Sequence, residues 1–271
     1  MTKYLATDLD GTLLYPKLKN NYMCKANIDA LKVFNKNVII VSGRNQLFAK
    51  KICNFLSIKE TFIACNGAAI CCEGKEIFLQ HIDTAQLNEL IDYVKKTYSK
   101  YTMILFDSKG NLYSICDDIN RAIETEKKHL TNFPKIAYTT DKNIDTINEL
   151  LSKENSIIKI NVALDYDGKI ELYNYLNSCN YDFTLAICNG SLEITARGIN
   201  KGASLKRLTE YMKLSNDDVY VIGDDKNDLS MFNEYPNSFL INHDNNKDLH
   251  NKVKHVLDSF KDIKNYIKED I

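Results

Sequence analysis

The sequence predicts an α/β fold in which a parallel sheet is interrupted by an inserted α+β segment. At both ends of the chain, short runs rich in Val, Ile and Phe alternate with helical patterns. Such runs, with little polar alternation, are typical of strands buried on both faces of a parallel sheet. The middle of the chain instead contains strand pairs joined by short turns, which is typical of antiparallel pairing.

The parallel sheet is expected from five apolar runs: Tyr4–Thr7, Val38–Val41, Phe62–Cys65, Val219–Ile222 and Ser238–Ile241. Helical patterns lie between or after these runs: Asn27–Asn35, Gln46–Leu56, Lys201–Met212, Asn227–Glu234 and about Lys247–Phe260. Because strands that alternate with helices are joined by right-handed crossovers, the strands should run parallel.

The middle segment has its own pattern. Its first helix is indicated by apolar residues at helical spacing: Leu87, Leu90, Ile91 and Val94. Two hairpins are expected, one around the turn Asp107–Gly110 and one around Asn189-Gly190, a dipeptide that favours tight turns. We therefore expect two domains, an α/β core of residues 1–81 plus 188–271 and an α+β domain of residues 82–187.

Composition narrows the class of protein. The chain has 271 residues, 44% of them hydrophobic and 26% charged, which fits two ordinary globular domains. Its net charge of -1 offers no basic surface for nucleic acid and no polybasic membrane anchor. We find no signal peptide and no long apolar span. The eight cysteines contain no C-x-x-C pair, so zinc is unsupported, and reduced thiols in a cytoplasmic protein are expected.

Acidic residues directly follow the first predicted strand, in Asp8-Leu9-Asp10-Gly11-Thr12. In an extended chain, Asp8 and Asp10 would point the same way, at the sheet edge where α/β proteins bind ligands. Two carboxylates this close repel each other unless a cation or a shared proton intervenes. Taken alone, this pattern also fits a solvated turn.

Three further clusters end strands or open helices. Ser42-Gly43-Arg44 offers a hydroxyl and backbone N–H groups to an anion, and Lys201 opens a helix as a point charge suited to phosphate. The third cluster follows the strand Val219–Ile222 with acids that suit magnesium: Asp224, Asp225 and Asp228. Each has a structural alternative, namely a Ser-Gly turn, a solvent-facing Lys and an acidic N-cap. All four clusters, however, should meet at one sheet edge.

In this order, the four clusters resemble the four motifs of the haloacid-dehalogenase (HAD) superfamily. The long insert before Lys201, together with Asn66-Gly67-Ala68 and Met231, resembles the Cof-like sugar phosphatases with a type IIB cap. The resemblance implies a Rossmann-like core with an inserted cap domain. One segment departs from it: residues 242–248 read Asn-His-Asp-Asn-Asn-Lys-Asp, where Cof-like proteins usually have small residues.

The resemblance also implies a function, the Mg2+-dependent hydrolysis of small phosphorylated metabolites such as sugar phosphates through an aspartyl-phosphate. Asp8 would be the nucleophile and Asp10 the general acid and base. Mg2+ would be held by the carboxylates of Asp8 and Asp224 and the backbone carbonyl of Asp10, with Asp228 orienting this shell. Phosphate contacts and support are expected from seven further residues: Leu9, Ser42, Gly43, Lys201, Asn227, Thr12 and Arg44.

Two alternatives stay open at this point. A sugar phosphomutase would carry the same motifs but protect its phosphoenzyme from water. A phospho-accepting regulatory protein would keep the phosphate on Asp8, although the second acid at Asp10 favours rapid hydrolysis. The expected partner is a small phosphorylated metabolite, with no nucleic acid and no membrane, and the chain should be a monomer or a small homo-oligomer.

Overall fold

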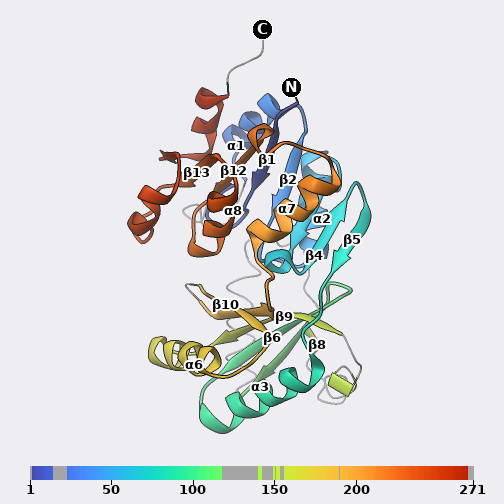
Figure 1. The fold of residues 1–271 in the computed structure, drawn as a ribbon, viewed down its shortest axis with the longest axis vertical. Helices are drawn as coiled ribbons and strands as arrows, with labels where there is room; N and C mark the ends of the chain where they lie inside the picture. Colours follow the sequence, from blue (N-terminus) through green and yellow to red (C-terminus); the bar gives the residue numbers. More distant parts are fainter. Residues whose placement is uncertain are drawn as a thin grey trace. The chain divides into compact units, whose positions relative to one another are not determined.

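The chain folds into two compact units, as a computed structural model shows. One unit contains residues 1–78 and 200–271, and the other contains residues 79–199 (Figure 1). The structure describes most of the chain: residues 2–14, 23–117, 140–141, 149, 151–152, 156–188 and 190–267.

The first unit is built on an eight-stranded sheet in the order β14-β13-β12-β1-β2-β3-β4-β5. The strands from β14 to β3 pair in parallel, and β4 pairs antiparallel with β3. The strands are, in chain order, β1 (Tyr4–Thr7), β2 (Val38–Val41), β3 (Phe62–Ala64), β4 (Ala69–Cys72), β5 (Lys75–Leu79), β12 (Val219–Gly223), β13 (Asn237–Ile241) and β14 (His255–Leu257).

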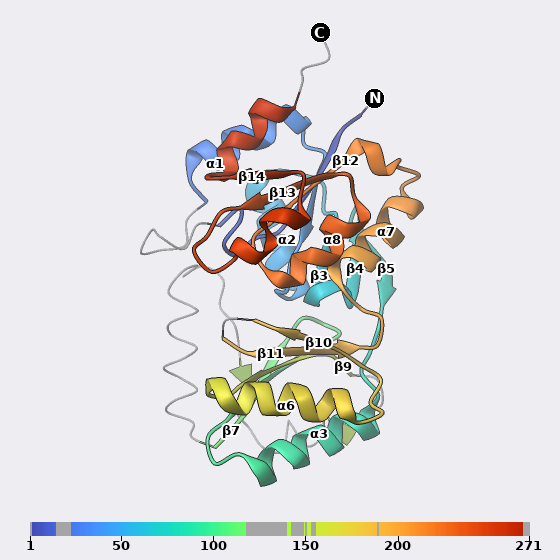
Figure 2. The same ribbon diagram turned by 60° about the vertical axis from the view of Figure 1, so that its left-hand side comes forward.

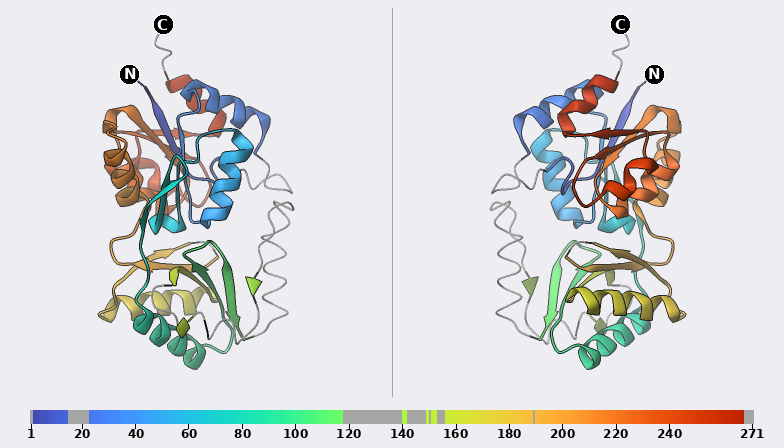
Figure 3. Two further views of the ribbon diagram at one scale, coloured as in Figure 1. Left: turned by 90° about the vertical axis from the view of Figure 1, so that its right-hand side faces the viewer. Right: turned by 90° about the vertical axis from the view of Figure 1, so that its left-hand side faces the viewer.

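Helices cover both faces of this sheet. Its α-helices are α1 (Lys25–Leu31), α2 (Gln46–Leu56), α7 (Lys201–Tyr211) and α8 (Leu229–Glu234). Its 3-10 turns are η1 (Lys32–Phe34), η2 (Cys65–Gly67), η3 (Asn216–Asp218), η4 (Lys226–Asp228), η5 (Lys247–Lys252) and η6 (Phe260–Tyr266). Figure 3 shows α1 and α2 on one face and α7 and α8 on the other. Alternate residues of the central strands pack under α7 and α8, which explains their continuous apolar runs.

The predicted elements of this unit are found with small shifts at their ends, except for the last helix. Residues 247–260 form η5 and the strand β14 instead of one helix. Here Phe239 pairs with His255 and Ile241 with Leu257, so β14 satisfies the backbone groups along the outer edge of β13. The expected helix is therefore wrong, because pairing with an open sheet edge outweighed a weak helical pattern.

The second unit has a six-stranded sheet in the order β10-β11-β9-β6-β7-β8. Its elements are α3 (Thr84–Thr97), β6 (Thr102–Asp107), β7 (Leu112–Cys116), β8 (Thr140–Asp141), β9 (Ile157–Ala163), α6 (Tyr166–Ser178), β10 (Phe183–Ile187) and β11 (Leu192–Ala196). Both predicted hairpins are present, β6 with β7 and β10 with β11. Helices α3 and α6 cover the same face of this sheet (Figure 2).

The boundaries of the units differ from the expected ones. The prediction ended the inserted domain at residue 187, whereas the structure continues it to residue 199. The reason is that β11 pairs with both β10 and β9, so it belongs to the second sheet. At the other end the unit begins at residue 79 instead of 82.

Two further observations concern the whole described chain. Among the residues that the structure describes, no helix combines the length and the apolarity needed to cross a lipid bilayer. All eight cysteines are free thiols, and four of them are buried: Cys53, Cys65, Cys71 and Cys72.

Candidate active site

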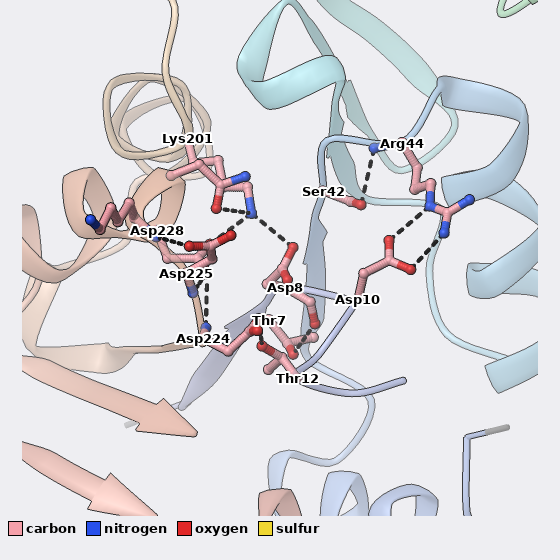
Figure 4. A network of polar contacts seen from close by, with 12 residues as sticks. Thr7, Asp8, Asp10, Thr12, Ser42, Arg44, Lys201, Asp224, Asp225 and Asp228 are labelled. Atoms are coloured by element: carbon pink, nitrogen blue, oxygen red, sulfur yellow. Dashed lines mark hydrogen bonds and ion pairs between the residues drawn. The ribbon is translucent and has the colours of Figure 1, made fainter. Parts of the chain in front are cut away.

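The candidate site lies at the carboxyl ends of three neighbouring strands of the first unit. Thr7, the last residue of β1, pairs with Ile40 of β2 and with Ile222 of β12. The next residue, Asp8, continues this pattern by donating its backbone N–H to the carbonyl of Ile222. Its carboxylate is 8% exposed and points toward Lys201 (Figure 4).

Lys201 is the centre of the polar network. Its ammonium donates to Asp8 Oδ1 at 2.8 Å, to Asp228 Oδ1 at 2.7 Å and to Asn227 Oδ1 at 3.4 Å. The side chain is only 1% exposed, although it lies in the first turn of α7. Asn200 caps this helix by accepting from the N–H of Ala203. The helix start therefore directs Lys201 into the protein, and the solvent-facing alternative is excluded.

Asp228 holds the loop after β12. Its Oδ2 accepts the backbone N–H groups of Asp224 at 2.9 Å and Asp225 at 3.1 Å. Gly223 makes this possible, because a Cβ there would lie 2.4 Å from the carboxyl carbon of Asp228. Since both oxygens of Asp228 already accept hydrogen bonds, this residue orients the loop while the Asp224 side chain remains turned toward the site.

Asp224 contacts the turn after β1. Thr12 is fully buried and donates its hydroxyl to Asp224 Oδ1 at 2.8 Å. Gly11 lies against the same carboxylate, since a Cβ at Gly11 would be 2.1 Å from Asp224 Oδ2, and its φ of +88° is in the region that favours glycine. The turn and the acidic loop are thus closely packed.

The carboxylate of Asp10 pairs with Arg44. Its two oxygens accept a guanidinium fork, at 2.7 Å from Arg44 Nε and 2.6 Å from Arg44 Nη2. Asp8 points toward Lys201 instead, so the expectation that both carboxylates face one spot is wrong (Figure 4). β1 ends at Thr7, and the alternation of an extended strand does not continue into the turn.

Ser42 follows β2 and is 1% exposed. Its Oγ accepts the backbone N–H of Arg44 at 3.1 Å, which shapes the loop that carries the guanidinium. The backbone N–H of Ser42 donates to the carbonyl of Ile63 in the neighbouring strand β3. The structure therefore places Ser42 and Arg44 in one loop beside Asp10, next to the network around Lys201.

The pKa values of two acidic residues at the site, Asp8 and Asp224, are raised. Burial, together with the nearby Asp228, raises the pKa of Asp8 from 3.8 to about 7, although Lys201 opposes this shift. Burial and the charges of Asp8 and Asp228 also raise the pKa of Asp224. Burial opposes the charge of Lys201, but Asp228 and Asp8 together raise its pKa above the ordinary value.

These residues fit a divalent cation. Oxygens of Asp8, Asp224 and Asp228 lie within 4.8 Å of one another. When ionised, the three carboxylates and the one ammonium have a net charge of -2, which Mg2+ would neutralise. Carboxylate oxygens are also the donors that Mg2+ prefers. The donor set therefore suits a hard divalent ion, with Asp8 and Asp224 as the carboxylates best turned toward it.

Sequence reasoning did not assign a role to two residues at this site. His243 Nε2 is 3.0 Å from the carbonyl oxygen of Gly11 and 3.5 Å from Asp224 Oδ2. Asn246 is buried and donates to the carbonyl of Asp224 at 2.7 Å. Both belong to the segment 242–248, whose departure from small residues was the signal in the sequence.

Comparison with known proteins agrees with this geometry. A model of the family described as haloacid dehalogenase-like hydrolase matches residues 5–265. An uncharacterised protein of Mycoplasma capricolum is 30% identical over 273 residues, covering 97% of this chain and all of the relative. The HMP-PP phosphatase of Escherichia coli O6:H1 is 25% identical over 246 residues, covering 89% of this chain and 84% of the relative.

Solved structures show the same fold. A haloacid dehalogenase-like hydrolase from B. subtilis superposes with a TM-score of 0.82 at 19% identity, over 98% of this chain and all of the other. A structure described as a HAD subclass IIB sugar phosphatase has a TM-score of 0.77 at 18% identity, over 98% of both chains.

Fold and site together define an enzyme with an α/β fold and a buried acidic centre at the edge of a parallel sheet. The chain belongs to the haloacid dehalogenase-like hydrolases, as the match over residues 5–265 shows. The resemblance seen in its four motifs is thereby confirmed, and its fold is that of the type IIB members. Its enzyme class is that of the phosphatases of this family.

Proposed function

We propose that this chain is a Mg2+-dependent phosphatase that hydrolyses small phosphorylated metabolites through a phosphoenzyme on Asp8. One observation carries the proposal: at the ends of β1 and β12, the buried ammonium of Lys201 contacts Asp8 and Asp228, whose oxygens lie within 4.8 Å of an oxygen of Asp224. This arrangement supplies a nucleophile, a cation for phosphate charge and a carboxylate site for a metal ion.

In the first step, a carboxylate oxygen of Asp8 attacks phosphorus and the bond to the leaving oxygen breaks. Asp10 gives a proton to the leaving oxygen and later takes one from the water that hydrolyses the phosphoenzyme. Because both oxygens of Asp10 accept from Arg44, at 2.7 and 2.6 Å, this pair must open and Asp10 must take up a proton from solvent before it can protonate the leaving oxygen. Arg44 thus holds the acid in a defined place between turnovers.

The other residues bind charge and keep the nucleophile in place. Lys201 holds Asp8 Oδ1 and offers its charge to the transferring group, aided by Ser42, Asn227 and the backbone N–H groups of Leu9 and Gly43. When bound, Mg2+ would neutralise phosphate charge as a Lewis acid. Asp8, Asp224 and the backbone carbonyl of Asp10 would hold it, while Thr12 and Asp228 keep these groups oriented.

The second unit supplies substrate choice in this proposal, as a cap domain that takes no part in the chemistry. All four motifs lie in the first unit, which leaves the insert free to recognise the part of the substrate beyond the phosphate. Sugar phosphates are our first candidates. Two relatives, named as an HMP-PP phosphatase and a sugar phosphatase, support a small phosphorylated substrate. The free thiols suit a reducing compartment, so we place the enzyme in the cytoplasm.

The decisive experiment is a panel of phosphorylated sugars, nucleotides and cofactors assayed with the purified full chain. Phosphate release should require Mg2+ and should stop after exhaustive chelation. Ca2+ should support weak activity or inhibit, because it takes more ligands at longer distances and would engage both oxygens of the nucleophile. Full activity after chelation would overturn the metal assignment.

The same panel separates the alternatives. A phosphomutase would interconvert sugar phosphates and would be activated by a bisphosphorylated sugar, with little release of free phosphate. A regulatory phospho-acceptor would keep a long-lived phosphate on Asp8 after one turnover. Multiple turnovers with stoichiometric phosphate release support the proposed phosphatase and contradict both alternatives.

A further inference from the structure

We propose that His243 is a positioning residue for the metal site, joining the turn after β1 to the acidic loop after β12. The inference rests on the proposed function, because it concerns the Mg2+ that Asp8 and Asp224 would hold. His243 comes from neither loop. It lies just beyond β13, in the segment where the family resemblance led us to expect small residues.

The ring of His243 reaches both metal-site loops with one nitrogen. Nε2 is 3.0 Å from the carbonyl oxygen of Gly11 and 3.5 Å from Asp224 Oδ2. Because a carbonyl oxygen only accepts hydrogen bonds, Nε2 carries the proton and donates it. The same N–H thus lies between the turn that follows Asp10 and a carboxylate that would bind the metal.

The segment that carries His243 is itself anchored to the acidic loop. Asn246 is 3% exposed, and its amide donates to the carbonyls of Asp224 at 2.7 Å and Ile241 at 2.8 Å. Its Oδ1 accepts the backbone N–H of His243 at 3.0 Å. Asn246 therefore fixes the backbone of His243 relative to Asp224, and the histidine ring is 17% exposed in side-chain area, which limits its freedom.

A fixed contact at this place matters because the two loops repel each other when they are ionised. Asp8 follows β1 and Asp224 follows β12, and their carboxylate oxygens lie within 4.8 Å of each other, so the two negative charges repel. Mg2+ requires a nearly ideal octahedral shell, so small shifts of its carboxylates are costly. Thr12 holds Asp224 Oδ1 from the turn, and His243 supports Oδ2 from a third element. Loss of such supporting contacts typically weakens metal binding about 10- to 100-fold.

The test measures Mg2+ binding directly, by isothermal titration calorimetry of the full chain without substrate. His243→Ala should raise the Kd for Mg2+ about tenfold or more. Its kcat at saturating Mg2+ should fall much less than its affinity. His243→Gln keeps an N–H donor of similar reach, and it should recover most of the affinity. Circular dichroism and thermal unfolding of each variant show whether it is folded.

His255→Ala is the matched control. His255 lies in β14 of the same unit, where its ring packs against Phe239 and Tyr266 at centroid distances of 5.1 and 4.4 Å. The variant should lose stability while keeping the wild-type Kd for Mg2+. If it weakened Mg2+ binding as much as His243→Ala, or if glutamine at position 243 gave no recovery, the positioning role would be wrong.

Two outcomes separate this inference from the proposed function. If the wild-type chain bound Mg2+ and His243→Ala bound it with the same Kd, the inference about His243 alone would be overturned. If the wild-type chain bound no Mg2+ and released phosphate without it, the proposed metal dependence would be overturned as well. Asp224→Asn provides the reference for loss of a direct ligand and should bind more weakly than His243→Ala.

Discussion

Each unit of the molecule contains a lysine that is only 1% exposed, Lys159 in the second unit and Lys201 in the first, and the surroundings of these two differ. In the second unit, Lys159 of β9 donates to Glu193 of β11 at 2.6 Å, and their side chains are 1% and 11% exposed. The ring of Phe106 lies 5.1 Å from the same ammonium. In the first unit, Lys201 is equally buried but contacts two carboxylates, Asp8 and Asp228, and a third, Asp224, lies within 4.8 Å of them. The first pair is balanced in charge, whereas the second cluster is not.

This difference separates a structural ion pair from a ligand site. Lys159 and Glu193 carry opposite charges and offset each other's burial cost. Around Lys201, burial and the neighbouring acids raise the pKa values of Asp8 and Asp224 although Lys201 lowers both, so ionising this cluster is costly. A buried cluster whose ionised groups carry a net negative charge favours the binding of a cation. The net charge of a buried polar network thus helps to distinguish a structural ion pair from a candidate ion-binding site.

The largest expected effect is on the nucleophile of the unbalanced cluster. Asp8→Asn should lower kcat at least on the order of a thousandfold, because an amide does not form the phosphoenzyme. The fold should persist, since the change removes a charge from a crowded buried site. Asp29→Asn, an exposed residue of α1, is the control for the same chemical change and should keep full activity. Turnover above roughly a tenth of wild type would eliminate Asp8 as the nucleophile.

Breaking the balanced pair should affect stability instead of chemistry. Lys159→Met leaves the carboxylate of Glu193 buried without its partner and should cost about 3–5 kcal/mol in the free energy of unfolding. The double variant Lys159→Met with Glu193→Leu should recover most of that loss, because it removes both charges. Urea unfolding measures both values. A Lys159→Met variant as stable as wild type would show that the pair is not what holds these two strands.

The unbalanced cluster should respond to pH in a defined direction. Since the folded-state pKa of Asp8 is raised from 3.8 to about 7, the folded protein binds a proton more tightly than the unfolded chain does. Protonation of Asp8 therefore adds to the free energy of unfolding. Without metal, this contribution is complete below about pH 4 and is lost as the pH rises through about 7. Mg2+ competes with that proton, so its affinity should fall ~10-fold per pH unit below 7. Thermal unfolding with and without Mg2+ at pH 5.5 and 8 checks this, and an equal Mg2+ effect at both values would contradict it.

The smallest expected effect concerns substrate choice by the second unit. On β9, Asn161 alternates with Ile160 and Val162, which pack under the helices, so Asn161 lies on the opposite face of the sheet. Among the described residues, none donates a hydrogen bond to its buried Oδ1. Asn161→Ala should change the ranking of substrates by several-fold in kcat/KM, since a hydrogen bond is worth about 0.5–1.5 kcal/mol.

A small aryl phosphate is the control for that variant, because it lacks a remote group for the second unit to recognise. Its kcat/KM should stay at the wild-type value. If Asn161→Ala lowered every substrate equally, including the aryl phosphate, then the division of labour between the two units would be wrong.

The sequence predicted the parallel strands and the inserted α+β segment because their patterns are local and strong. Gln46–Leu56 is an example, since the predicted helix and α2 have the same ends. The strands β4, β5 and β14, which lie at or next to the edges of the sheet, were missed, because short runs such as Ala69–Cys72 become strands only by pairing with a neighbour. Such pairing depends on contacts that are distant in sequence.

For the site, the motifs predicted which residue types gather at the sheet edge but not how they pair. Lys201, Asp224 and Asp228 come together around Asp8, as expected from strand ends that share an edge. The fork between Arg44 and Asp10 was not predicted, because the direction of Asp10 depends on the turn after β1. His243 has no recognisable motif, and only its distance from Gly11 and Asp224 reveals its place.

The insertion of the second unit also determines when, during translation, Asp8 meets Lys201 and Asp224. β1 is made early, yet its neighbour β12 begins at residue 219, and Lys201 and Asp224 follow the whole insert. Translation adds about 5–20 residues per second, so Asp8 waits on the order of ten seconds or more for its partners. Residues 79–199 are contiguous and complete their own sheet within that interval. A ribosome-bound fragment that ends before β12 therefore lacks Asp224, Asp228 and the strand that pairs with β1 on one side, so its acidic centre is incomplete.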